Sequence, residues 1–175
     1  MTLAAKSLLL IAVLGLAACN NPDRYGAGGA GGAGGAGGAG GIDTTGLGDP
    51  NNPTSIAYFN QTVGDRVLFA VDQSTISPEG RGILTAQANW LNQNTGYAAI
   101  IEGHADEKGT REYNLALGAR RAAAVQNFLI SQGVAANRLR TISYGKERPL
   151  EVCSEEACYA KNRRAVTVLS AGAGV

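Results

Sequence analysis

The sequence predicts an α+β fold, in which two main helices pack on one small mixed four-stranded sheet and a flexible tether precedes the domain. The chain has 175 residues, which suits one domain with additional segments. Strand and helix patterns alternate from about residue 60 onward, and the preceding residues are rich in glycine. We therefore expect a signal segment (1–18), a flexible linker (19–59) and a single folded domain (60–171).

The folded part contains four short apolar runs and two longer amphipathic segments. Ser77 followed by Pro78 is a typical helix start, with serine as the N-cap and proline in the first turn. Thr110 can cap the second helix in the same way, and Gly133 can end it. Because the two helices separate the first three strands, we expect one sheet covered on one face. The expected helices are 78–91 and 111–131, and the expected strands are 67–71, 97–102, 141–144 and 165–169.

The first residues have the features of an export signal. Lys6 supplies a positive charge, and residues 8–14 form an apolar run that is too short to span a bilayer, which needs about 20 residues. Residues 16–19, Leu-Ala-Ala-Cys, resemble a bacterial lipobox, whose cysteine is lipidated; the alternative is an ordinary secretory signal followed by a cysteine. The resemblance implies lipidation of Cys19 and, because Asn20 rather than aspartate follows it, sorting to the outer membrane.

Residues 27–41 are five tandem Ala-Gly-Gly triplets. A collagen helix would need proline-rich positions between the glycines, and none occur here. Without large side chains the tract cannot bury enough apolar area to offset the cost of ordering its backbone. We therefore predict a flexible tether. From Cys19 to about Val63 its r.m.s. reach would be about 35 to 40 Å, and its full extension roughly 150 Å.

Charge and cysteine content narrow the function classes. The formal net charge is +1, which disfavours nucleic-acid binding, because such proteins concentrate Lys and Arg on one face. Cys153 and Cys158 remain after the lipobox cysteine, and in an exported protein such a pair most simply forms a disulfide. A zinc site with two thiolates would need further ligands, and the single histidine, His104, lies far away in sequence.

The second predicted helix carries polar residues on its apolar face. Leu117, Ala124 and Phe128 fall within about 40° of one another on a helical wheel, and Arg121 falls inside the same stripe. A buried guanidinium is costly unless it is paired, and the preceding loop offers the carboxylates of Asp106 and Glu107. Asn114 lies in line with Arg121, two turns earlier. The residues alone leave two interpretations open: an anion-binding site, or a structural salt bridge or solvent-reaching arginine.

Several polar and glycine-containing motifs are spread along the folded region. They are Glu102–Thr110, Tyr113–Asn114, Leu117–Gly118, Arg120–Ala122, Ser143–Glu147 and Lys161–Ala165. Together they resemble the OmpA-like peptidoglycan-binding domain family, and most closely its lipid-anchored members. The motifs occur in the family's order and cover essentially the whole folded region.

The resemblance implies recognition of diaminopimelate in the peptidoglycan stem peptide. The end of that residue carries an ammonium and a carboxylate, which Asp106 and Arg121 would bind, with Asn114 beside them. The loop after the first strand departs from the family at positions 70, 71, 73 and 74, but retains Asp72. The last-strand motif Asn162-Arg163-Arg164 is also implied in binding, although strand alternation should let only one of the two arginines touch ligand.

The resemblance also implies a non-enzymatic role as a tether between the outer membrane and peptidoglycan, without cofactor or metal. It implies TolB and TolA as protein partners in envelope constriction at cell division. A hydrolase centred on residues 104–107 is disfavoured, because one histidine cannot supply a typical zinc site and no catalytic triad is apparent. A lipid-anchored protein-interaction module, with a purely structural Asp–Arg pair, remains the alternative.

The lipid anchor generates the first testable prediction. Cys19→Ala should release the protein from membranes into the soluble periplasmic fraction, because the acyl chains provide the attachment. Asn20→Asp should instead shift the protein toward the inner membrane. Fractionation of cells followed by immunoblotting measures both effects. A Cys19→Ala protein that still sediments with the outer membrane would contradict lipidation at this residue.

Overall fold

The structure, a computed structural model, describes residues 47–152 and 154–171. The expected signal segment, Cys19, the Ala-Gly-Gly tract and Cys153 lie outside these residues, so the structure does not bear on them.

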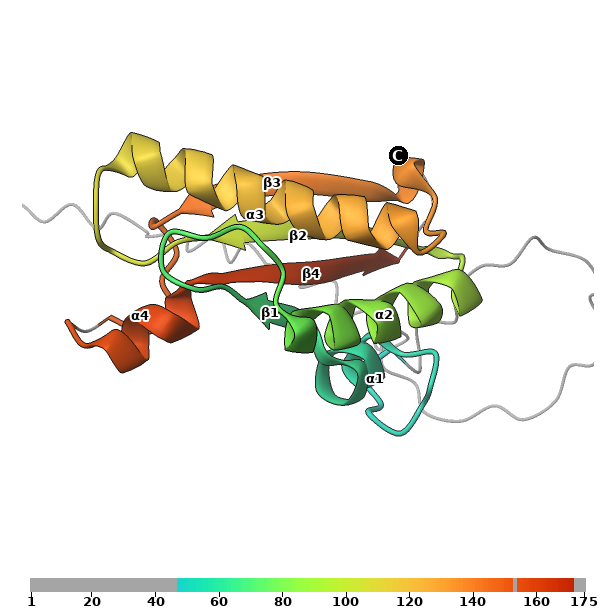
Figure 1. The fold of residues 1–175 in the computed structure, drawn as a ribbon. Helices are drawn as coiled ribbons and strands as arrows, with labels where there is room; N and C mark the ends of the chain where they lie inside the picture. The colour runs from blue at the N-terminus through green and yellow to red at the C-terminus, as the bar shows by residue number, and fades with distance from the viewer. Residues whose placement is uncertain (1–46, 153, 172–175) are drawn as a thin grey trace, which may run out of the picture. The chain divides into compact units, whose positions relative to one another are not determined.

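The described residues form two layers, with helices packed on a four-stranded sheet (Figure 1). The strand order is β1-β4-β2-β3; β2 and β3 are parallel and the other neighbouring pairs are antiparallel. This arrangement confirms the predicted α+β class and mixed sheet. No helix of the described part is long and apolar enough to cross a membrane. The elements in order are α1 (Ile56–Tyr58), η3 (Phe59–Gly64), β1 (Arg66–Leu68), α2 (Pro78–Gln93), β2 (Tyr97–His104), α3 (Arg111–Ser131), η4 (Ala136–Arg138), β3 (Leu139–Gly145), α4 (Glu156–Asn162) and β4 (Arg164–Ala171).

Both main helices begin at the predicted caps. The hydroxyl of Ser77 accepts a hydrogen bond from Gly80 N at 3.1 Å, and that of Thr110 accepts one from Tyr113 N at 3.2 Å. Gly133, with φ of 91°, follows the end of α3. The short helix α4 was not predicted, because its sequence has no capping side chain and only one buried residue, Asn162.

Two strand ends differ from the prediction. β1 stops at Leu68 instead of Val71, because the chain turns away: Gln73 N donates to Ala70 O at 3.2 Å. Asp72 adopts a φ of 56° within this turn, a conformation that aspartate tolerates better than most residues. β2 instead continues to His104, so the loop before α3 is shorter than predicted.

The core lies between the sheet and helices α2 and α3. Tyr97, Ala99 and Ile101 alternate along β2 and are at most 3% exposed. On α3, the buried stripe is rotated from the predicted one: it includes Leu117 and Arg121 but centres on other positions, and Ala124 and Phe128 are only partly buried. On the opposite face of the sheet, within the described residues, Leu68, Ile100, Ile142 and Val168 are exposed.

The packed domain begins earlier than the predicted boundary at residue 60. Phe59 is fully buried, with its ring centroid 5.0 Å from that of Trp90. The indole N–H of Trp90 donates to Pro53 O at 2.7 Å, and the Tyr97 hydroxyl donates to Thr54 O at 2.8 Å. Buried Trp and Tyr need partners for their polar atoms, so residues 53 and 54 are part of the folded unit.

Two glycines let α3 approach the sheet closely. A Cβ atom on Gly103 of β2 would lie 1.9 Å from Gly118 O, and one on Gly118 of α3 would lie 2.4 Å from Ser143 Oγ and 2.8 Å from Gly103 O. Any side chain at either position would push the helix away from β2 and β3. The contact therefore fixes the start of α3 beside the end of β2, where the predicted site residues lie.

This contact generates the second prediction. Gly118→Ala should lower the free energy of unfolding by about 2 to 3 kcal/mol, because the added methyl group overlaps backbone atoms. Gly82→Ala is the matched control: Gly82 lies in α2 with nothing near its Cβ position, and the change should raise stability by about 0.5 to 1 kcal/mol. Denaturant unfolding of both variants measures the difference. Equal stabilities would contradict the close contact.

Candidate functional site

A pocket of about 280 Å³ lies where the β1–α2 loop, the β2–α3 loop and the start of α3 meet. Three predicted site residues, Asp72, Asp106 and Asn114, line it together. The full lining is Val71, Asp72, Asp106, Lys108, Gly109, Tyr113, Asn114 and Leu117.

Asp72 and Tyr113 form one side of the pocket. The Tyr113 hydroxyl donates to Asp72 Oδ1 and thereby joins α3 to the β1–α2 loop. This hydrogen bond, and then burial, raises the pKa of Tyr113, so the phenol stays protonated at neutral pH. Tyr113 was part of a family motif but was not a predicted binding residue. Its contact with Asp72 spans 41 positions and cannot be predicted from sequence spacing.

Asn114 fixes the loop that carries Asp106. Its side chain is 1% exposed, and its Nδ2 donates to Lys108 O at 2.8 Å. Lys108 N in turn donates to Asp106 Oδ1 at 3.2 Å, and Lys146 Nζ donates to Gly109 O at 2.7 Å. These bonds give the loop one conformation and present the Asp106 carboxylate at the pocket wall.

Arg121 lies beneath this pocket and is 0% exposed. Its guanidinium donates to the carbonyl oxygens of Gln73 and His104 at 2.8 Å and of Ala70 at 3.2 Å. Burial lowers the pKa of Arg121 to about 10, against the opposing effect of nearby Asp106. The arginine therefore stays charged at neutral pH and ties the β1–α2 loop to the end of β2.

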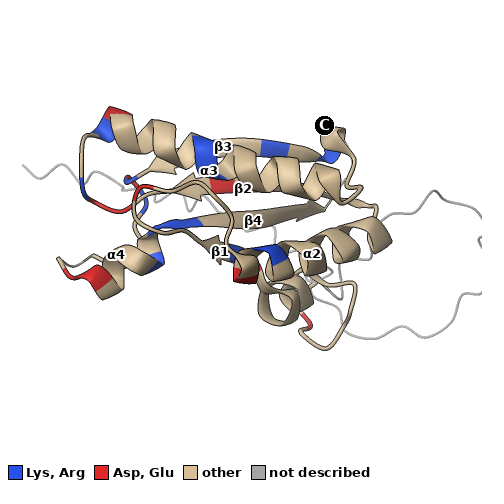
Figure 2. Cartoon of the chain, viewed as in Figure 1, with Lys and Arg blue, Asp and Glu red and all other residues tan. Residues whose placement is uncertain are grey.

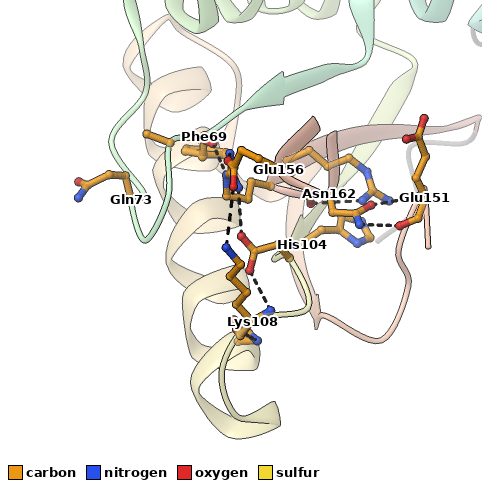
Figure 3. Close-up of polar contacts among 12 residues, drawn as sticks. Phe69, Gln73, His104, Lys108, Glu151, Glu156 and Asn162 are labelled. Carbon is orange, nitrogen blue, oxygen red and sulfur yellow. Dashed lines mark hydrogen bonds and ion pairs between the residues drawn. The ribbon is translucent and has the colours of Figure 1, made fainter. Parts of the chain in front are cut away.

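The cation that hydrogen-bonds Asp106 is Arg163, so the direct Asp106–Arg121 salt bridge of the structural alternative does not form. Arg163 Nη1 lies 3.2 Å from Asp106 Oδ2, and its Nη2 lies 2.6 Å from Glu156 Oε1 (Figure 3). Its Nε also donates to Phe69 O at 3.2 Å. Among the contacts of the described residues, the Arg121 guanidinium donates to carbonyl oxygens only. Helical spacing correctly indicated a buried arginine but could not indicate which acceptor it finds.

The other predicted binding residues do not line this pocket: Arg121, Asn162, Arg163 and Arg164, of which only one of the last two was expected to touch ligand. The Asn162 amide binds the backbone of the preceding loop, accepting from Leu150 N at 2.7 Å and donating to Glu151 O at 2.7 Å (Figure 3). Arg164 donates to the carbonyl oxygens of Asn162 and Arg148. Burial is the main cause that lowers the pKa of Arg164. Of the two neighbouring arginines, Arg163 is the one that the structure places beside Asp106.

His104 is a buried residue at the end of β2. His104 is 1% exposed, and burial, followed by the charges of Arg164 and Arg148, lowers its pKa to about 4. It is therefore neutral at pH 7. Across residues 47–152 and 154–171, no group of three or more His, Cys, Asp or Glu side chains could hold a metal. Cys158 is disulfide-bonded; its predicted partner, Cys153, lies outside the described residues.

Acidic and basic side chains occur together in and around the pocket. Three carboxylates (Asp72, Asp106 and Glu156) surround or adjoin the pocket together with three cations (Lys108, Arg121 and Arg163). Figure 2 shows both charge signs at the end of the domain where α4 and the start of α3 lie. Such an arrangement suits a ligand group that carries one positive and one negative charge.

Comparison with known proteins places the chain in a family. The OmpA family profile matches residues 68–163. The peptidoglycan-associated lipoprotein of Mesorhizobium japonicum is 59% identical over 122 residues, covering 70% of this chain and 72% of the relative. That of Haemophilus influenzae is 40% identical over 162 residues, covering 92% and 95%.

Solved structures of related proteins have the same fold as this chain. The crystal structure of the Burkholderia pseudomallei peptidoglycan-associated lipoprotein is similar, with a TM-score of 0.62 and 35% identity, covering 69% of this chain and 98% of the other. The C-terminal domain of Helicobacter pylori MotB shares the fold at 23% identity, with a TM-score of 0.58 and coverage of 62% and 86%. The chain thus belongs to the OmpA family, within its branch of peptidoglycan-associated lipoproteins.

Proposed function

We propose that this chain tethers the outer membrane to peptidoglycan without a covalent bond, by binding the diaminopimelate residue of the stem peptide. The names of its relatives, which describe peptidoglycan-associated lipoproteins, support association with the cell wall. The family is a non-catalytic binding family, so the chain is not an enzyme. The observation that carries the proposal is the pocket, which joins Asp72 and Asp106 from distant segments above a buried cation.

The pocket chemistry fits the free end of meso-diaminopimelate, which bears an ammonium and a carboxylate on one carbon. Asp72 and Asp106 can accept hydrogen bonds from the ammonium. Arg121 is 0% exposed and donates to three backbone carbonyls, so it would attract the carboxylate through its charge and not through a direct hydrogen bond. Lys108 supplies a second positive charge at the pocket wall. A plain lysine side chain lacks the carboxylate and would use only half of these groups.

The remaining parts of the proposal rest on the N-terminal sequence and the family. Lipidation of Cys19 would hold the chain in the outer membrane, and the flexible tether would let the periplasmic domain reach the wall. Binding to TolB and TolA, and through them a role in envelope constriction at division, follows from family resemblance. A disulfide between Cys153 and Cys158 would then hold the start of α4, which carries Glu156.

A second function has one observation in its favour. Because three backbone carbonyls occupy Arg121, this arginine has a structural role even without ligand. The domain could then be a lipid-anchored protein-interaction module whose buried charges only stabilise loops. The two functions differ in what the pocket carboxylates do, since a purely structural domain does not need them to be accessible.

The third prediction separates these functions. Asp106→Asn and Asp72→Asn should each abolish co-sedimentation with purified peptidoglycan while the domain remains folded, because the ammonium loses its anionic partner. Free meso-diaminopimelate should compete with wild-type binding, and free lysine should compete much less. Arg121 is unsuitable for this test, since truncation would leave three backbone carbonyls without their donor, at a cost of about 1 to 3 kcal/mol for each one left buried.

Glu107→Gln is the matched control, because Glu107 carries the same charge in the same loop but does not line the pocket. It should bind peptidoglycan like the wild type. Thermal melting confirms that each variant is folded. Folded Asp72→Asn and Asp106→Asn proteins that still co-sediment would overturn diaminopimelate recognition by this pocket and favour the interaction module.

A further inference from the structure

Arg163 is shared between an acid inside the pocket and an acid outside it. Its contact with Asp106 Oδ2 measures 3.2 Å, whereas its contact with Glu156 Oε1 measures 2.6 Å. The Arg163 and Asp106 side chains are 7% and 11% exposed, but Glu156 is 60% exposed. Charge-assisted hydrogen bonds between nitrogen and oxygen usually measure about 2.7 to 2.9 Å. Arg163 therefore lies closer to Glu156 than to the pocket carboxylate.

This sharing matters for a ligand that brings an ammonium group. A carboxylate fully paired with its own arginine has little attraction left for a second cation, and breaking that pair in a buried site is costly. A second acid on the arginine lowers this cost, because Arg163 keeps an anionic partner when Asp106 turns to the ligand. Glu156 is placed for that role on α4, outside the pocket lining.

We propose that Glu156 is a positioning residue for ligand binding: it holds Arg163 so that Asp106 can pair with an incoming ammonium group. The inference rests on the function proposed above, since it concerns the same pocket. It adds a residue from α4, where the only predicted binding residue was Asn162 at the end of the helix.

A purely structural role for Glu156 must be distinguished. Lys108 Nζ lies 3.9 Å from Glu156 Oε2 and 4.8 Å from the centroid of the Tyr159 ring, so α4 also packs against the loop that carries Asp106. If Glu156 only fastened α4 to this loop, its loss would reduce binding regardless of Arg163. If it acts through Arg163, removal of the arginine should cancel the effect of removing the glutamate.

The fourth prediction uses this difference. In the detergent-solubilised full chain, Glu156→Gln should weaken binding of meso-diaminopimelate about tenfold, a typical size for coupling between sites. Glu156→Asp should retain most of the affinity. Glu155→Gln, one residue earlier and also exposed, removes the same charge and should bind like the wild type. The double variant Glu156→Gln/Arg163→Gln should bind better than Glu156→Gln alone, because no arginine then competes for Asp106.

Calorimetric titration with meso-diaminopimelate measures these affinities, and thermal melting measures folding. Recovery in the double variant supports the proposal even if Glu156→Gln lowers stability, since a second buried substitution would not restore a damaged fold. Wild-type affinity of Glu156→Gln, or no recovery in the double variant, overturns it. If the Glu156 proposal is overturned but Asp106→Asn abolishes binding in the same series, diaminopimelate recognition by the pocket still stands. If Asp106→Asn binds normally, both proposals fall.

Discussion

The buried guanidinium of Arg121 is the constraint on which the arrangement of the site depends. Its donors reach Ala70 and Gln73 in the β1–α2 loop and His104 at the end of β2. An arginine with no exposed surface needs nearly all of its donors satisfied, so the two loops have little freedom to move apart. The same charge lies beneath two pocket carboxylates and contributes to the potential that they experience. One side chain thus fixes the geometry of the pocket and sets part of its electrostatics.

Local signals predicted most of the fold. The caps at Ser77 and Thr110 predicted where α2 and α3 begin, because capping depends on a few neighbouring residues. Short apolar runs located all four strands to within a few positions. Asp72, Asp106 and Asn114 were predicted site residues by family resemblance, and the structure brings them to one pocket. Whether they bind ligand remains a proposal.

The prediction failed where distant segments decide the outcome. Asp106 and Arg163 are 57 positions apart, so sequence spacing could not indicate that they form an ion pair. The early start of the domain depends on contacts from Trp90 and Tyr97 to residues 53 and 54, which have no pattern of their own. α4 is short and mostly exposed, and its position depends on Asn162 clamping the preceding loop. In each case the stabilising partner is not a sequence neighbour.

Residues 53 and 54 and the pocket loop lie at opposite ends of β2. Thr54 O accepts a hydrogen bond from Tyr97, where β2 begins, and the pocket loop starts after His104, where β2 ends. An eight-residue strand spans about 25 Å. With the proposed N-terminal anchor, a pull on a ligand held by Asp106 would act along β2, which is hydrogen-bonded on both sides by β3 and β4. Tension in this direction loads the hydrogen bonds of the sheet together in shear, a geometry that resists mechanical rupture better than peeling bonds one at a time.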